Sequence, residues 1–71
     1  MKRVARVTDF LIFMPSGFAG WGDIDFASKT VVFKGYGPQA DNFARAFRAG
    51  ELRRKRLSLR SGKVWFTLSN R

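Results

Sequence analysis

Residues 52–68, LRRKRLSLRSGKVWFTL, carry the clearest structural pattern of this chain, because apolar and basic side chains alternate on both sides of Ser61-Gly62. A two-residue turn at Ser61-Gly62 predicts a β-hairpin. Successive side chains of a strand point to opposite faces. One predicted face therefore collects Leu57, Leu59, Val64, Phe66 and Leu68, and the other collects Arg54, Arg56, Ser58, Arg60, Lys63, Trp65 and Thr67. We expect the apolar face to lie on a core and the basic face to meet solvent.

The first half of the chain predicts further strands. Residues 3–14 are rich in β-branched and aromatic side chains and stop at a proline, which is typical of a strand. Residues 14–22 contain three glycines and predict a loop. Residues 23–34 predict a second hairpin with Ser28-Lys29 at its turn, which would pair Phe26 with Val31.

A helix is predicted between the two hairpins. Pro38 suits its first position and Gly50 its end. Helical spacing relates the apolar residues between them, Ala40, Phe43, Ala44 and Phe47. The sequence therefore predicts one small α+β domain over residues 1–71, with a mostly antiparallel sheet of about five strands, the order β-β-β-α-β-β and one covering helix.

Composition excludes several classes of function. The 71 residues contain neither Cys nor His, so cysteine–histidine metal sites and the commonest acid–base and thiol catalysts are not available. We expect no enzyme activity, cofactor or metal. The longest apolar run, residues 10–14, is far too short to cross a bilayer, which predicts a soluble cytoplasmic protein without membrane contact. Eight Phe supply core bulk, and self-association to a homo-oligomer could add to it.

The charge is strongly positive and unevenly distributed. The net charge is +9; residues 1–37 carry five cations and three anions, whereas residues 38–71 carry nine cations and two anions. A basic surplus in one half of a chain is typical of proteins that bind polyanions. The alternative is a generally basic protein whose charge only keeps it dispersed.

The candidate site is a nucleic-acid interface on the basic face of residues 52–68. Phosphate contacts would relieve repulsion among its cations, and Trp65 could stack on a base. The predicted binding residues are Arg53, Arg54, Arg56, Arg60, Lys63 and Trp65, extended by Arg45 and Arg48 of the helix. Single strands are preferred over duplexes because the tryptophan is exposed, and little sequence specificity is expected.

Each of these residues also has a purely structural interpretation. The basic run could protect an edge strand from pairing with other chains, or form an import signal. Trp65 could instead pack beneath arginine stems, and a one-residue slip of the hairpin would exchange it with Phe66.

Three other features are assigned structural roles. Phe18 and Trp21 are predicted to fold over the core as a lid. Asp23 and Asp25 could hold a magnesium ion, but neutralisation by neighbouring lysines is the better interpretation. Residues 35–37, Gly-Tyr-Gly, match no phosphate-binding pattern and predict a turn.

The rival hypothesis is a small protein-binding module or inhibitor, of a viral or regulatory type, that docks on an acidic partner protein. Small size, high charge and an apolar loop are compatible with both hypotheses.

Overall fold

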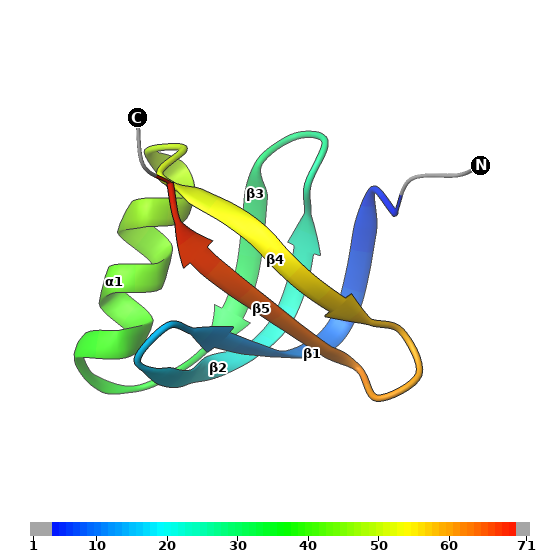
Figure 1. The fold of residues 1–71 in the computed structure, drawn as a ribbon, viewed down its shortest axis with the longest axis horizontal. Helices are drawn as coiled ribbons and strands as arrows, with labels where there is room; N and C mark the ends of the chain where they lie inside the picture. Colours follow the sequence, from blue (N-terminus) through cyan, green and yellow to red (C-terminus); the bar gives the residue numbers. More distant parts are fainter. Residues whose placement is uncertain (1–3, 70–71) are drawn as a thin grey trace.

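The structure, a computed structural model, describes residues 4–69 and confirms a small α+β fold with five strands and one helix (Figure 1). The elements in chain order are β1 (Arg6–Met14), β2 (Gly17–Asp25), β3 (Thr30–Lys34), α1 (Gly37–Arg48), β4 (Leu52–Ser58) and β5 (Lys63–Leu68). The predicted first strand thus begins later than expected, and residue 3 lies outside the described residues.

The strands form one sheet in the order β3-β2-β1-β5-β4. Every neighbouring pair is antiparallel except β1 and β5, which run parallel in the middle of the sheet. The sheet is therefore mixed. The connection through α1 and β4 returns the chain to the side of β1 and allows this parallel pairing.

The predicted loop at residues 14–22 is wrong, because most of it is strand β2. Pro15 and Ser16 form a tight turn that pairs Met14 with Gly17. Glycines usually weaken a strand, but β2 is hydrogen-bonded on both sides, to β1 and β3. Position 22 must be a glycine, because a Cβ there would overlap the carbonyl oxygen of Val32 on β3.

Both predicted hairpins exist, but their turns contain four residues rather than two. Ile24 pairs with Val31 where Phe26 was expected, and Leu57 pairs with Val64 where Leu59 was expected. Each register differs from the prediction by two residues, so the side chains keep their predicted faces. The exception is Leu59, which lies in the β4–β5 turn and is 63% exposed instead of reaching the core.

A bulge in β4 overturns a second detail of the predicted basic face. The pairing shifts between Arg54 and Arg56, with Arg56 opposite Trp65 but Arg54 opposite Phe66. One extra residue in a strand reverses the faces beyond it. Arg54 therefore lies on the core side of the hairpin rather than beside Trp65.

The predicted helix is confirmed and covers one sheet face, but its buried stripe differs at one position: Ala46 is buried, whereas Ala44, predicted to belong to the stripe, is only half-buried. Pro38 lies in its first turn, and Ala40, Phe43, Ala46 and Phe47 are its buried residues. At its end, Gly50 has a φ of 73°, and the backbone N–H groups of Gly50 and Glu51 donate to the carbonyls of Phe47 and Ala46. This is a Schellman motif, which explains why the helix ends at a glycine.

Aromatic rings fill the core between α1 and the sheet. Phe43 is fully buried and packs against Phe33, Phe47 and Phe66, with ring centroids 5.1, 5.6 and 5.3 Å away. The sheet is rolled, since Phe26, after β2, reaches Phe66 on β5 at a centroid distance of 6.4 Å. Within residues 4–69 no helix has the length and hydropathy needed to cross a membrane.

Candidate nucleic-acid interface

The sheet face opposite α1, here called the outer face, carries a continuous row of aromatic side chains. Phe13 on β1 stacks with Trp65 on β5 at a centroid distance of 5.5 Å and meets Phe18 on β2 edge to face, also at 5.5 Å. Phe18 lies 6.4 Å from Trp21, and Trp21 lies 6.5 Å from Tyr36. We call Trp65, Phe13, Phe18, Trp21 and Tyr36 the aromatic row.

Much of this row is accessible to solvent. Phe18 is 48% exposed and Tyr36 is 83% exposed, while Phe13, Trp21 and Trp65 are half-buried by their neighbours in the row. The inward residues of the same strands, such as Ile12 and Val64, are fully buried. The rings are therefore additional to the core, and they leave large apolar surfaces in contact with water.

A cation covers the β5 end of the row. The guanidinium carbon of Arg56 lies 4.7 Å from the centre of the Trp65 ring, which is a cation–π contact. The indole is thus held between Phe13 and Arg56. A base approaching this end would meet the guanidinium plane, which stacks on bases much as an aromatic ring does.

A second line of outer-face residues shares Trp21 with the aromatic row. Strand pairing places Lys63 next to Leu11, Leu11 next to Trp21, and Trp21 next to Lys34. A lysine therefore stands at each end of this line, and apolar surface lies between the two ammonium groups.

The predicted cations of β4 and β5 are partly brought together. Arg53 lies opposite Thr67, and Thr67 is two residues beyond Trp65 and therefore on the same face of β5. Arg53, Arg56 and Lys63 thus share the outer face. Arg60 lies exposed in the β4–β5 turn near Lys63. These cations and Trp65 make up the part of the predicted site that the fold assembles.

Arg54 does not belong to that group. Its guanidinium lies 4.6 Å from the centre of the Phe26 ring, and its Nη1 donates to the carbonyl of Val4 at 3.2 Å. Arg54 therefore joins β4 to the opposite end of the rolled sheet. Its expected place on the basic face was wrong because the bulge at Lys55 could not be foreseen.

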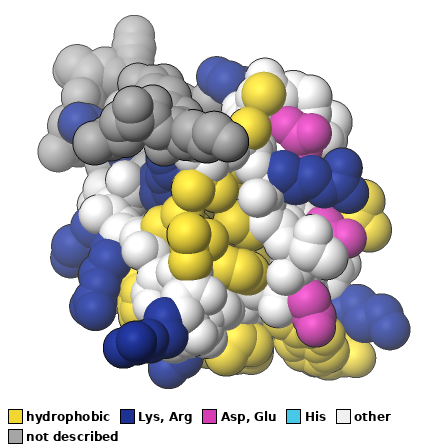
Figure 2. Space-filling model, turned by 90° about the vertical axis from the view of Figure 1, so that its right-hand side faces the viewer, with side chains coloured by type: hydrophobic (Ala, Val, Ile, Leu, Met, Phe, Trp, Pro, Cys, Tyr) yellow, Lys and Arg dark blue, Asp and Glu magenta, His cyan; other side chains and the backbone are white. Residues whose placement is uncertain are grey.

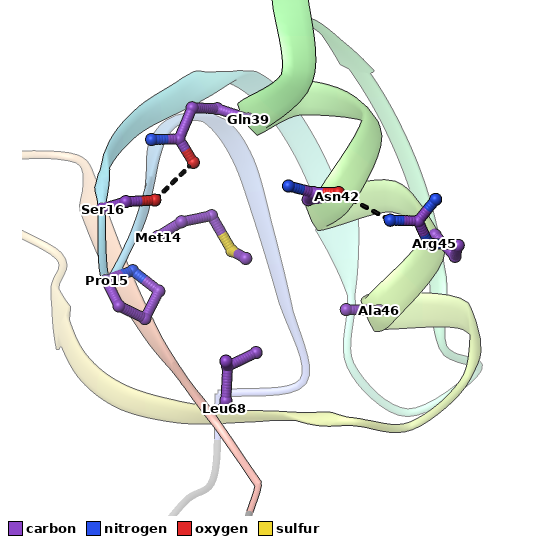
Figure 3. A pocket seen from close by; sticks show the side chains of 8 residues that line it. All are labelled: Met14, Pro15, Ser16, Gln39, Asn42, Arg45, Ala46 and Leu68. Carbon is purple, nitrogen blue, oxygen red and sulfur yellow. Dashed lines mark hydrogen bonds between the residues drawn. The ribbon is translucent and has the colours of Figure 1, made fainter.

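Arg45 and Arg48 lie on α1, on the other side of the sheet from the aromatic row. Arg45 donates to Asn42 at 2.6 Å and borders a depression of about 370 Å³ between α1, the β1–β2 turn and the end of β5 (Figure 3). Met14, Ala46 and Leu68 give this depression an apolar lining. The two helix arginines thus form a separate surface.

The paired aspartates have structural roles. Asp23 accepts a hydrogen bond of 2.8 Å from the backbone N–H of Asp9, a bulge residue with a φ of 59°. Asp25 accepts 3.0 Å bonds from the N–H groups of Ala27 and Ser28 in the β2–β3 turn. These bonds, that of Ser28 first, hold the pKa of Asp25 below its usual value. Residues 4–69 contain no cluster of three or more potential metal-binding side chains.

Charge is segregated around the molecule. Acidic residues 9, 23 and 25 lie on β1 and β2, whereas β4 and β5 carry only basic charges. In the end-on view of Figure 2, the acidic side chains lie on the right-hand side among basic ones, and the charged side chains visible on the left-hand side are basic. A polyanion would therefore be attracted to the β4–β5 side of the outer face.

Sequence reasoning found one end of the outer face and missed the rest. Phe18 and Trp21, predicted to form a lid over the core, lie on the opposite face of the sheet from α1. The sequence placed Phe13 only in the predicted first strand and Tyr36 only in a predicted turn. A usable signal existed in β1, because Leu11 and Phe13 alternate with Phe10 and Ile12, so one pair had to face away from the core.

Comparison with known proteins gives no relative: no protein-family model, curated protein or solved structure matches this chain.

Proposed function

We propose that this protein binds single-stranded nucleic acid on the outer face of its sheet, without catalysis and with little sequence specificity. The observation that supports this best is the aromatic row, which crosses three strands and has cations at its β4–β5 end. Aromatic rings on an open sheet face stack with unpaired bases, at about 1–3 kcal/mol per base.

The cations would contact the sugar–phosphate backbone. Arg53, Arg56, Arg60 and Lys63 lie on or beside the outer face, close to the Trp65 end of the row. Binding of phosphates by these groups releases counterions, which drives association and makes it dependent on salt. Single strands fit better than duplexes, because a duplex hides the faces of its bases from the rings.

Fluorescence anisotropy with short single- and double-stranded oligonucleotides tests the proposal. Tyr36→Ala removes an 83% exposed ring that makes no side-chain cap on α1, so the fold should survive. We expect affinity for single strands to fall about fivefold to a hundredfold, the equivalent of one stacked base. Leu68→Ala is the matched control, because Leu68 is also exposed but lies on the other face. Equal affinities of wild type and Tyr36→Ala would contradict the proposal.

A protein partner is the second candidate, and the depression beside Arg45 favours it. An apolar side chain of a partner could enter between Met14 and Leu68, while an acidic neighbour paired with Arg45. Affinity purification from nuclease-treated lysate with wild type and Arg45→Glu tests this. A protein that the wild type retains and Arg45→Glu loses would support the second candidate. A protein that Arg45→Glu retains and Tyr36→Ala loses would argue against it.

A further inference from the structure

Besides the depression beside α1, a depression of about 380 Å³ lies on the outer face, at the β2–β3 end of the aromatic row. It is lined by Asp9, Trp21, Gly22, Val32, Phe33 and Lys34. Trp21, a member of the aromatic row, is part of this lining, and Val32, 77% exposed, adds apolar surface. A planar ring could be held there by stacking and apolar contact.

The polar side chains that line this depression are Asp9, a hydrogen-bond acceptor, and Lys34, a donor. Asp9 brings a carboxylate, because the β1 bulge sets its backbone at a φ of 59° while its N–H is held by Asp23. Lys34 brings an ammonium group and is the direct cross-strand neighbour of Trp21. Asp23 and Asp25 lie on the same side of the sheet, so a phosphate would be repelled here and a neutral base would not.

The geometry points to a guanine subsite at this depression, which rests on the proposed function and adds a base preference to it. Guanine is the base that presents two adjacent N–H donors, N1 and N2, next to a carbonyl acceptor, O6. A carboxylate can accept both N–H groups, and an ammonium can donate to O6. Adenine and cytosine present an acceptor beside their single amino donor, and that acceptor would face the carboxylate unfavourably.

The test compares short oligothymidylates that carry one central guanine, adenine or hypoxanthine. Wild type should bind the guanine oligonucleotide about tenfold more tightly than the adenine one, as a bidentate base contact allows. Hypoxanthine lacks the N2 amine and should lose most of that preference. This comparison needs no variant and does not depend on the folding of any mutant.

Asp9→Asn identifies the residue responsible. Asparagine tolerates the left-handed backbone of position 9, so the bulge should remain. We expect affinity for the guanine oligonucleotide to fall to that for adenine, with adenine binding changed less than twofold. Asp41→Asn, the same charge change on α1, should keep the preference.

The outcomes separate the two proposals. Tight but equal binding of all three oligonucleotides would overturn the guanine subsite and leave the proposed function standing. A preference that persists in Asp9→Asn would also overturn it. Absence of binding to every oligonucleotide would overturn the proposed function and the subsite together.

Discussion

Arg54 and Arg56, separated by one residue, have different environments, because the bulge at Lys55 turns their side chains to opposite faces of the sheet. Arg54 lies over Phe26 and donates to Val4, whereas Arg56 lies over Trp65 on the outer face. Chemically identical side chains therefore provide a matched comparison between stability and binding.

We predict that Arg54→Ala lowers the free energy of unfolding by about 0.5–1 kcal/mol, the usual size of an exposed cation–π contact. Its affinity for single strands should change little. On the proposed function, Arg56→Ala should weaken oligonucleotide binding more than Arg54→Ala does, because the Arg56 guanidinium would supply a phosphate contact and a stacking plane. Chemical denaturation and anisotropy measured on both variants check this. The prediction fails if Arg54→Ala has the larger effect on affinity.

Asp25 gives the stability a dependence on pH. Its pKa is lowered by hydrogen bonds from the turn, so its stabilising effect is complete above the unfolded-state value of about 4 and is lost as pH falls through the lower folded-state pKa. In acid titrations followed by denaturation, wild type should be more stable than Asp25→Ala near neutral pH. The two curves should converge in acid. A difference that stays constant at every pH would show that the charge is irrelevant.

At the scale of elements, β2 depends on having no side chain where it meets its neighbour. A Cβ at Gly22 would overlap backbone atoms of Val32 and Phe33, which cannot move without breaking the β2–β3 ladder. Overpacking of this kind typically costs about 1–3 kcal/mol.

Gly22→Ala should therefore lower the midpoint of thermal unfolding, measured by circular dichroism. Gly37→Ala is the control for loss of a glycine without overlap: position 37 has a φ of 82°, but a Cβ there would meet nothing within 4 Å. Its cost should come from backbone strain alone, about 1–2 kcal/mol, and stay below that of Gly22→Ala. Equal destabilisation by both substitutions would mean that crowding at Gly22 is unimportant.

The hairpins illustrate what local sequence can and cannot predict. Alternation placed Val64 and Phe66 inward and Trp65 outward correctly, because a strand has only two faces. Turn length was wrong at both 26–29 and 59–62, because neither stretch contains the Asn-Gly or Asp-Gly pair that favours a two-residue turn, and four-residue loops are also common. Because each register differed by two residues, the strand side chains kept their predicted faces, and only Leu59 was lost from the core, to the turn. Arg54 was misplaced for a separate reason, the bulge in β4.

For the molecule as a whole, the aromatic row could not be predicted from any one segment. Phe13 meets Trp65 only because β1 and β5 pair in parallel, and it meets Phe18 only because residues 17–25 are a strand. Both conditions depend on contacts between distant parts of the chain. Sequence reasoning therefore identified the basic end of the candidate interface together with Trp65, and missed the other aromatic residues of the row.

The arrangement of charge predicts a moderate salt dependence. If the four cations Arg53, Arg56, Arg60 and Lys63 each neutralise one phosphate, the logarithm of affinity should fall against the logarithm of salt with a slope of about −3, at roughly −0.7 per phosphate on a single strand. Anisotropy titrations over a salt series measure this slope. Reversing the charge of Arg48 on α1 should leave it unchanged, and a slope near zero would exclude phosphate contacts.

The parallel pairing of β1 with β5 also has a consequence for synthesis. As the polypeptide leaves the ribosome, β5 becomes available to pair with β1 only after about fifty further residues have emerged. Until then the edge of β1 at Leu11, Ile12 and Phe13, the residues that pair with β5, has no hydrogen-bonding partner. Folding of such a high-contact-order sheet is expected to be slow, and the nascent chain is most vulnerable to aggregation in that interval.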